Sequence, residues 1–73
     1  MKKVNILLNS FEKVERFVNA SFSMNDKLKL ESGNYTVNGK SLLGIFNLDL
    51  SKPITMVMKE NVDLPKEFEI FMI

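Results

Sequence analysis

The chain of 73 residues contains no histidine and no cysteine. Metal centres built on imidazole or thiolate ligands are therefore excluded, and so are catalytic triads and proton shuttles that depend on histidine. A phosphohistidine cannot form, and no disulfide can stabilise the fold. The absence of cysteine is typical of intracellular proteins, so we expect a cytoplasmic location.

An excess of charge of one sign and a long apolar run are also missing. Ten Lys and Arg residues against nine Asp and Glu residues leave a net charge of +1, whereas proteins that bind nucleic acid rely on clustered basic residues. The first apolar run ends at Asn9 and is too short for a signal-peptide core or a membrane span. We therefore expect one small soluble domain over residues 1–73, with neither nucleic acid nor membrane as a partner.

Hydrophobic periodicity predicts the order of the elements. The apolar run 4–8 predicts a strand, and residues 10–22 have the spacing of an amphipathic helix. Residues 27–37 alternate around a Ser-Gly-Asn turn and predict a β-hairpin. A short helix over 42–46 and a strand over 54–60 follow. These elements predict an α+β two-layer domain, with helices on one face of an antiparallel four-stranded sheet.

The same spacing assigns side chains to the core. The inward stripe expected for the first helix comprises Phe11, Val14, Phe17, Val18 and Phe22. Ile45 is expected in the core, and so are three methionines, Met56, Met58 and Met72. Residues 61–73 suit either a strand or a short helix, and the helix is favoured because Pro65 is compatible with a first helical turn.

Polar residues at three positions fit helix N-caps. Asn9 followed by Glu12 has the spacing of a capping box, and Ser10 offers an alternative cap for the same helix. Ser41 stands directly before the second apolar segment and predicts a cap there. Gly44 lies inside that segment and is expected to limit the length of its helix.

The sequence contains no arrangement of residues that predicts catalysis. Asp49 and Glu60 have no spacing that would pair them, and the three glycines are isolated, so no phosphate-cradling loop is present. We therefore expect a protein that is not an enzyme and that requires no cofactor and no metal.

Residues 40–48 read KSLLGIFNL. This run, and more broadly residues 27–58, resembles the middle of HPr, the phosphocarrier protein of the bacterial phosphotransferase system. The predicted order of elements is also that of HPr. The resemblance implies an HPr-like β-α-β-β-α-β sandwich, and the few residues after the last predicted strand leave the family's final helix short or absent.

The junction between the first strand and the first helix departs from the family pattern. In HPr this loop carries the phosphoryl-accepting histidine, with an arginine and a proline nearby, whereas Asn9 and Ser10 occupy the place here. Neither side chain forms the labile phosphoramidate that lets the carrier pass its phosphoryl group onward. The chain therefore resembles a divergent, histidine-less member with a degenerate active-site loop, similar in that respect to the catabolite-repression paralogue Crh.

Ser41 falls on the serine that HPr kinase/phosphorylase modifies in the family, and the phosphorylated form binds the catabolite repressor. The resemblance thus implies regulatory phosphorylation of Ser41. The phosphate would face the N–H groups of the following helix, with Lys40 beside it. The alternative is that Ser41 only caps that helix, an interaction typically worth about 1 kcal/mol.

The residues of HPr that match Lys40, Leu42, Leu43 and Phe46 belong to its docking surface for partner proteins. Exposed apolar patches usually mark such sites; the alternative is that some of these side chains pack inward. The function expected from the resemblance is a regulatory or adaptor protein that docks partners through residues 41–46 without carrier activity. The competing expectation is a structural domain that keeps the HPr fold and buries the apolar residues in a homodimer.

Overall fold

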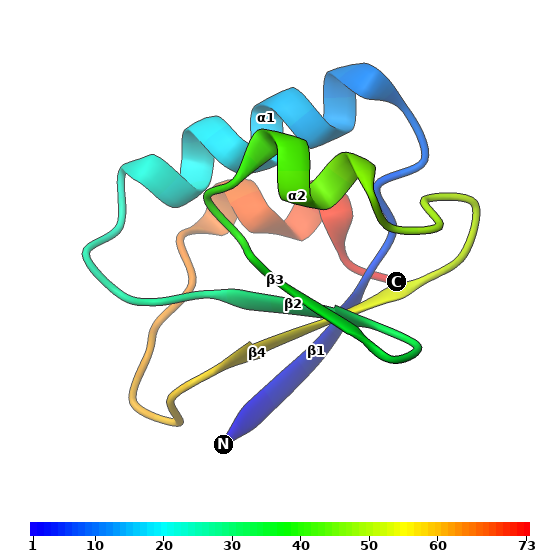
Figure 1. The fold of residues 1–73 in the computed structure, drawn as a ribbon. Coiled ribbons are helices and arrows are strands. Elements are labelled where there is room, and N and C mark those ends of the chain that lie inside the picture. Colours follow the sequence, from blue (N-terminus) through cyan, green and yellow to red (C-terminus); the bar gives the residue numbers. More distant parts are fainter.

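Four strands form one antiparallel sheet, and the helices cover only one of its faces (Figure 1). The strands of the computed structural model, which describes residues 1–73, are β1 (Lys2–Ile6), β2 (Lys29–Ser32), β3 (Tyr35–Asn38) and β4 (Ile54–Met58). The helices are α1 (Phe11–Phe22), α2 (Leu42–Phe46) and the 3-10 helix η1 (Lys66–Phe71). The predicted α+β two-layer architecture is confirmed.

The strand order β1-β4-β2-β3 places the last strand of the sequence in the interior of the sheet. In the register of its two pairings, Met56 of β4 lies between Val4 of β1 and Leu30 of β2. Because side chains alternate along a strand, Ile54 and Met58 share the face of Met56, and all three are buried. This face of β4 forms the centre of the sheet's contact with the helices.

The β2–β3 connection is a two-residue hairpin loop, Gly33-Asn34, between the paired residues Ser32 and Tyr35. Gly33 has a φ of 59°, and no other residue has a positive φ. A two-residue loop with positive φ at its first position alone matches a type II′ turn, whose twist fits that of the flanking strands. The predicted hairpin is confirmed.

The core is a cluster of 17 buried residues between the sheet and the helices. Phe17 of α1 meets Phe68 and Phe71 of η1 edge to face, and the three ring centroids lie 5.4 to 6.0 Å apart. This geometry stabilises aromatic pairs beyond their burial, so the short η1 closes the core with two rings. None of the helices has the length and apolarity needed to cross a membrane.

The C-terminal segment combines the two structures that its sequence allowed. A short helix forms, as predicted, but as a 3-10 helix, and Pro65 occupies its N-cap rather than its first turn. Beyond η1, Met72 forms a β-bridge with Ile6, and the Leu7 N–H donates a hydrogen bond to the Phe71 carbonyl at 2.8 Å. The tail thereby covers part of the outer edge of β1.

The first strand begins earlier than the prediction over residues 4–8. The backbone of Lys2 pairs with Met58, and the Lys2 ammonium group donates to the Val62 carbonyl. Leu8 is buried although the chain has left the sheet by then. The apolar run marked buried side chains correctly but did not give the limits of the strand.

Three side chains expected in the core are exposed instead. Phe11 and Phe22 are 61% and 66% exposed because they occupy the two ends of α1, away from the buried stripe. Met72 is 37% exposed because it follows η1 at the edge of the sheet. Ile45 is fully buried, as predicted.

Candidate docking surface

The loop before α1 ends in a serine cap. Ser10 has an extended backbone, and its Oγ accepts a hydrogen bond from the Lys13 N–H at 3.1 Å. Glu12 pairs with Arg16 at 2.7 Å on the exposed side of the helix rather than returning to the cap. Ser10 is therefore the cap that forms, and the expected Asn9–Glu12 capping box is wrong. Both Asn9 and Ser10 are exposed.

Ser41 caps α2. Its Oγ accepts a hydrogen bond from the Gly44 N–H at 3.1 Å, and its carbonyl accepts one from the Ile45 N–H at 3.0 Å. The residue is half-buried rather than sealed in the core. The predicted cap is confirmed, and phosphorylation of Ser41 stays a prediction.

Gly44 allows the start of α2 to approach β3 closely. A Cβ at this position would lie 3.0 Å from the Ser41 Oγ and 3.3 Å from the Val37 Cβ. Both distances are shorter than ordinary van der Waals contact, so a side chain here would displace α2 or its cap. The sequence suggested only that Gly44 would shorten the helix, because nothing in it shows that Val37 of β3 lies opposite.

The ammonium group of Lys40 is engaged within the fold. Its Nζ donates a hydrogen bond to the Met24 carbonyl at 2.8 Å, in the connection between α1 and β2. Its backbone N–H donates to the Asn38 Oδ1, also at 2.8 Å. The Lys40 side chain thus joins the β3–α2 connection to the α1–β2 connection. Partner binding by Lys40 stays a prediction.

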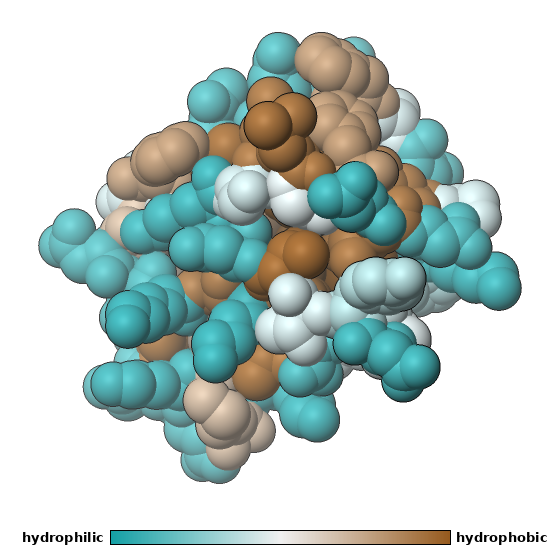
Figure 2. Space-filling view, viewed as in Figure 1, coloured by the Kyte–Doolittle hydropathy of each residue, from teal (hydrophilic) through white to brown (hydrophobic).

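Side chains of α2 and α1 form an exposed apolar surface (Figure 2). Leu43 is 79% exposed, whereas Leu42 and Phe46 are 37% and 39% exposed. Phe11 of α1 stacks on Phe46, with ring centroids 5.6 Å apart and an interplanar angle of 17°. We call Phe11, Leu42, Leu43 and Phe46 the apolar surface.

Phe11 is the member of the apolar surface that sequence reasoning missed. Its helical spacing with Val14 and Phe17 favoured a core position, but the first turn of α1 brings its ring to α2 instead. The only signal in the sequence was its place at the very start of the helix, directly after the cap, where a side chain often lies beyond the buried stripe.

Acidic groups do not assemble into a metal site, because no three of them lie close enough together to hold an ion. The pKa of Asp49 is lowered by hydrogen bonds from the Ser51 hydroxyl and the Ser51 N–H, with a smaller contribution from the Lys52 charge. These contacts lie at 2.6 and 3.1 Å from Oδ1, in the exposed loop between α2 and β4. Glu60 pairs with the N-terminus at 3.3 Å. The two carboxylates hold chain segments in place and do not face each other.

Comparisons with known proteins bear on the fold. No protein-family model matches the chain, and no curated protein matches it. A solved structure does match: HPr-C-His from Thermoanaerobacter tengcongensis, with a TM-score of 0.73 over 94% of this chain and 84% of that chain. Sequence identity between the two is 22%. The molecule is thus an open-faced α+β sandwich, and its fold is that of HPr, as the resemblance implied.

Proposed function

We propose that this chain is a regulatory or adaptor protein that binds partner proteins through the apolar surface and does not relay phosphate through histidine. The observation that carries this proposal is the 79% exposure of Leu43 beside the stacked rings of Phe11 and Phe46, on an HPr fold without histidine. The proposed role is binding rather than catalysis, in the cytoplasm, within the bacterial phosphotransferase system.

Covering the exposed side chains of this surface with a partner protein would supply free energy for binding. Covering an exposed Leu or Phe side chain contributes roughly 1.5–3 kcal/mol. The stacking of Phe11 on Phe46 at 5.6 Å restrains both rings before binding, which lowers the entropy lost on association. The surface comprises only four side chains, so we infer a small, transient interface with Leu43 at its centre.

Phosphorylation of Ser41 is the proposed switch. A phosphoserine carries about −1.5 to −2 charges near neutral pH and offers three acceptor oxygens. The Ser41 Oγ already accepts from the Gly44 N–H, so the phosphate would face the same N–H groups at the start of α2. The new charge would stand directly before Leu42 and Leu43 and would change which partners the surface accepts.

The proposed modifying enzyme is HPr kinase/phosphorylase, and the proposed reader is a catabolite repressor. Incubation with this kinase and ATP should add one phosphate to the intact mass. Ser41→Ala should abolish the gain, and Ser10→Ala should keep it, since Ser10 is the matching cap of α1. An unchanged mass of the unsubstituted chain would remove the switch and leave docking in place.

Docking is tested by titrating the labelled, phosphorylated chain with a purified catabolite repressor. Leu43→Ser should weaken binding at least about tenfold, because it removes the most exposed apolar side chain of the surface. Ile70→Ser is the matched control, since Ile70 is 53% exposed on η1, outside the apolar surface. Equal weakening by both variants would contradict docking through the apolar surface.

Two further measurements separate this function from its competitors. With enzyme I and phosphoenolpyruvate, the chain should acquire no acid-labile phosphate, because no imidazole is present. Light scattering should show a monomer. A dimer that Leu43→Ser dissociates would favour the structural, homo-oligomerising alternative instead.

A further inference from the structure

The sheet face that the helices leave uncovered carries a row of lysines. Val57 of β4 is paired with Lys3 of β1 on one side and with Lys29 of β2 on the other. Because Met56 and Leu30 face the helices, the side chains of this row point to the opposite face. Strands lie about 4.8 Å apart, so the two lysines stand roughly 10 Å from each other across Val57.

Two more lysines extend this row. Lys27 precedes Lys29 by two residues and Lys59 follows Val57 by two, so both lie just beyond the strands at the same end of the sheet, and both are exposed. They line one hollow with Asn25, Asp26 and Val62. We call Lys3, Lys27, Lys29 and Lys59 the basic face.

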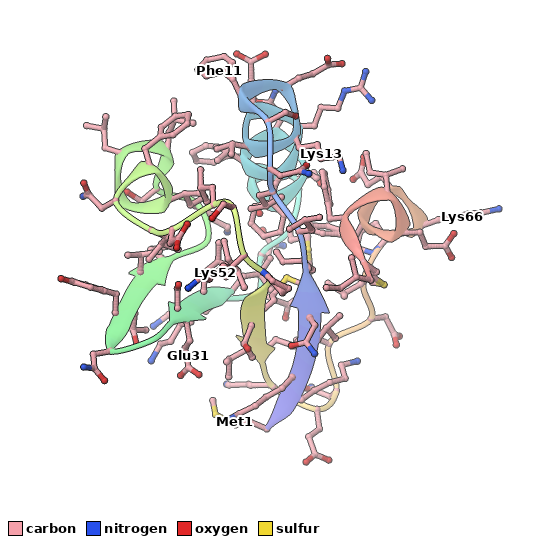
Figure 3. The ribbon with its side chains drawn as sticks, turned by 90° about the vertical axis from the view of Figure 1, so that its right-hand side faces the viewer. Met1, Phe11, Lys13, Glu31, Lys52 and Lys66 are labelled. Carbon is pink, nitrogen blue, oxygen red and sulfur yellow. The ribbon has the colours of Figure 1, made fainter.

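Figure 3 shows the two sides of the molecule. Lys13 and Lys66 lie in the helical layer, whereas Glu31 and Met1 lie on the side of the sheet away from the helices. The strand register places Lys3 and Lys29 on that second side. The basic face as a whole gathers four of the nine lysines of a chain whose net charge is only +1.

The four ammonium groups of the basic face are exposed and unpaired. The ion pairs of the chain join the N-terminus to Glu60, Arg16 to Glu12, and Lys52 to Asp49, and none involves the basic face. Like charges gathered in this way repel one another and do not stabilise the fold.

Shielding of apolar side chains from water explains only part of this clustering of lysines. Val57 is 5% exposed, and the alkyl chains of Lys3 and Lys29 beside it can shield it from water. Lys27 and Lys59 likewise line a hollow with Val62, which is 3% exposed. Shielding involves only the alkyl chains, so it gives no reason for four ammonium groups without a partner in the fold. An anionic ligand would account for all four.

We propose that the basic face binds an acidic segment of a partner protein, with carboxylates of the partner placed against Lys3, Lys27, Lys29 and Lys59. Charge complementarity supplies the attraction, and it acts on the side of the sheet opposite the apolar surface. The proposal therefore does not depend on the function of the apolar surface, and both faces can be occupied at once.

The row next to the lysines favours a protein over other polyanions. It holds Glu31, Thr55 and Thr36 in register across three strands. A uniformly negative lipid surface would meet the Glu31 carboxylate, whereas a protein can place a donor opposite it. The outward rows contain no arginine and no aromatic ring, which are the side chains that stack on bases of single-stranded nucleic acid.

The test is a titration of the 15N-labelled full chain at low salt with a peptide of consecutive glutamates, and with a glutamine peptide of equal length as the neutral control. The glutamate peptide should shift the amide signals around Lys3, Val57 and Lys29, and added salt should weaken it. The glutamine peptide should cause no shift. Oligo-thymidine and phosphatidylserine vesicles serve as competing polyanions.

Charge reversal locates the site. Lys3→Glu with Lys29→Glu should lower affinity for the glutamate peptide about tenfold or more, whereas Lys13→Glu with Lys66→Glu, which changes the net charge equally, should lower it less than about threefold. If the charge reversal disturbs folding, the milder pair Lys3→Gln with Lys29→Gln provides the same test. Absent shifts, equal loss in both pairs, or tighter binding of oligo-thymidine or vesicles would overturn the proposal.

Discussion

The apolar surface and the basic face lie on opposite sides of the sheet and rely on different forces. The apolar surface consists of side chains on α1 and α2, and the affinity that we propose for a partner would come from removing Leu43 and two stacked rings from water. The basic face consists of residues in or directly beside the strands, and its proposed attraction for a partner is Coulombic. The first should change little with salt and the second should weaken with it.

The comparison also shows how each surface arises from the backbone. The basic face follows from the two-residue period of β1, β2 and β4, which divides their side chains between the core and solvent. The apolar surface arises because α2 has only five residues and is held against β3 by its cap and by Gly44. One surface is a regular consequence of the sheet, and the other depends on local contacts.

The contrast between the two surfaces would not hold if the side chains of the apolar surface belonged to the core. Phe17→Ala should lower the free energy of unfolding by about 3–5 kcal/mol, because Phe17 is fully buried against two other rings. Phe11→Ala should cost less than about 1 kcal/mol, because the ring is 61% exposed and only its stacking on Phe46 is lost. Urea denaturation measures both, and similar losses would place Phe11 in the core.

This contrast between Phe11 and Phe17 also shows what the sequence can predict. Helical spacing located α1 and the buried Phe17, because the period of 3.6 residues is set by the helix itself. Spacing cannot show where the sheet ends beneath a helix, so Phe11 and Phe22 were wrongly assigned to the core. The order of elements and the hairpin at Gly33 could be predicted because alternation and turn residues are local signals.

Gly44 tests whether α2 depends on its close approach to β3. Gly44→Ala should destabilise the fold by about 1–3 kcal/mol, although alanine normally favours a helix, because its Cβ would lie 3.0 Å from the Ser41 Oγ. Removing this oxygen in the double variant Ser41→Ala, Gly44→Ala should recover part of the loss. Thermal or urea unfolding measures the coupling, and strictly additive effects would contradict the contact.

The candidate sites were less predictable than the fold, because they depend on tertiary pairing. The alternation over residues 27–37 places Lys27 and Lys29 on the same face of the predicted hairpin. Their proximity to Lys3 follows from the insertion of β4 between β1 and β2, which the sequence does not reveal. The hydrogen bond from Lys40 to the Met24 carbonyl joins two connections in the same way. Sequence reasoning therefore found Ser41 and Leu43, whose signals are local, and missed the basic face.

The basic face should also affect stability in a way that the apolar surface does not. Lys3→Gln with Lys29→Gln should raise the free energy of unfolding by a few tenths of a kcal/mol at low salt, since it relieves repulsion between like charges. The gain should vanish near 1 M salt, where the screening length is about 3 Å. Leu43→Ser should show no such salt dependence. A salt-independent gain from the lysine pair would mean that packing, not charge, distinguishes this face.

The smallest expected effect concerns the loop that leads from α2 to β4. Hydrogen bonds from Ser51 lower the pKa of Asp49 below its usual value of 3.8. Because the folded pKa is below the unfolded one, the stabilisation is present above the unfolded pKa and is lost as pH falls through the folded pKa. Asp49→Asn should therefore lower the urea midpoint slightly at neutral pH, and this difference should shrink as the pH falls well below 3.8.

The control is Asp63→Asn, which changes an exposed aspartate outside this loop and should cause a smaller change in the urea midpoint. A difference for Asp49→Asn that persists in acid would assign the role of Asp49 to loop geometry, independent of its charge.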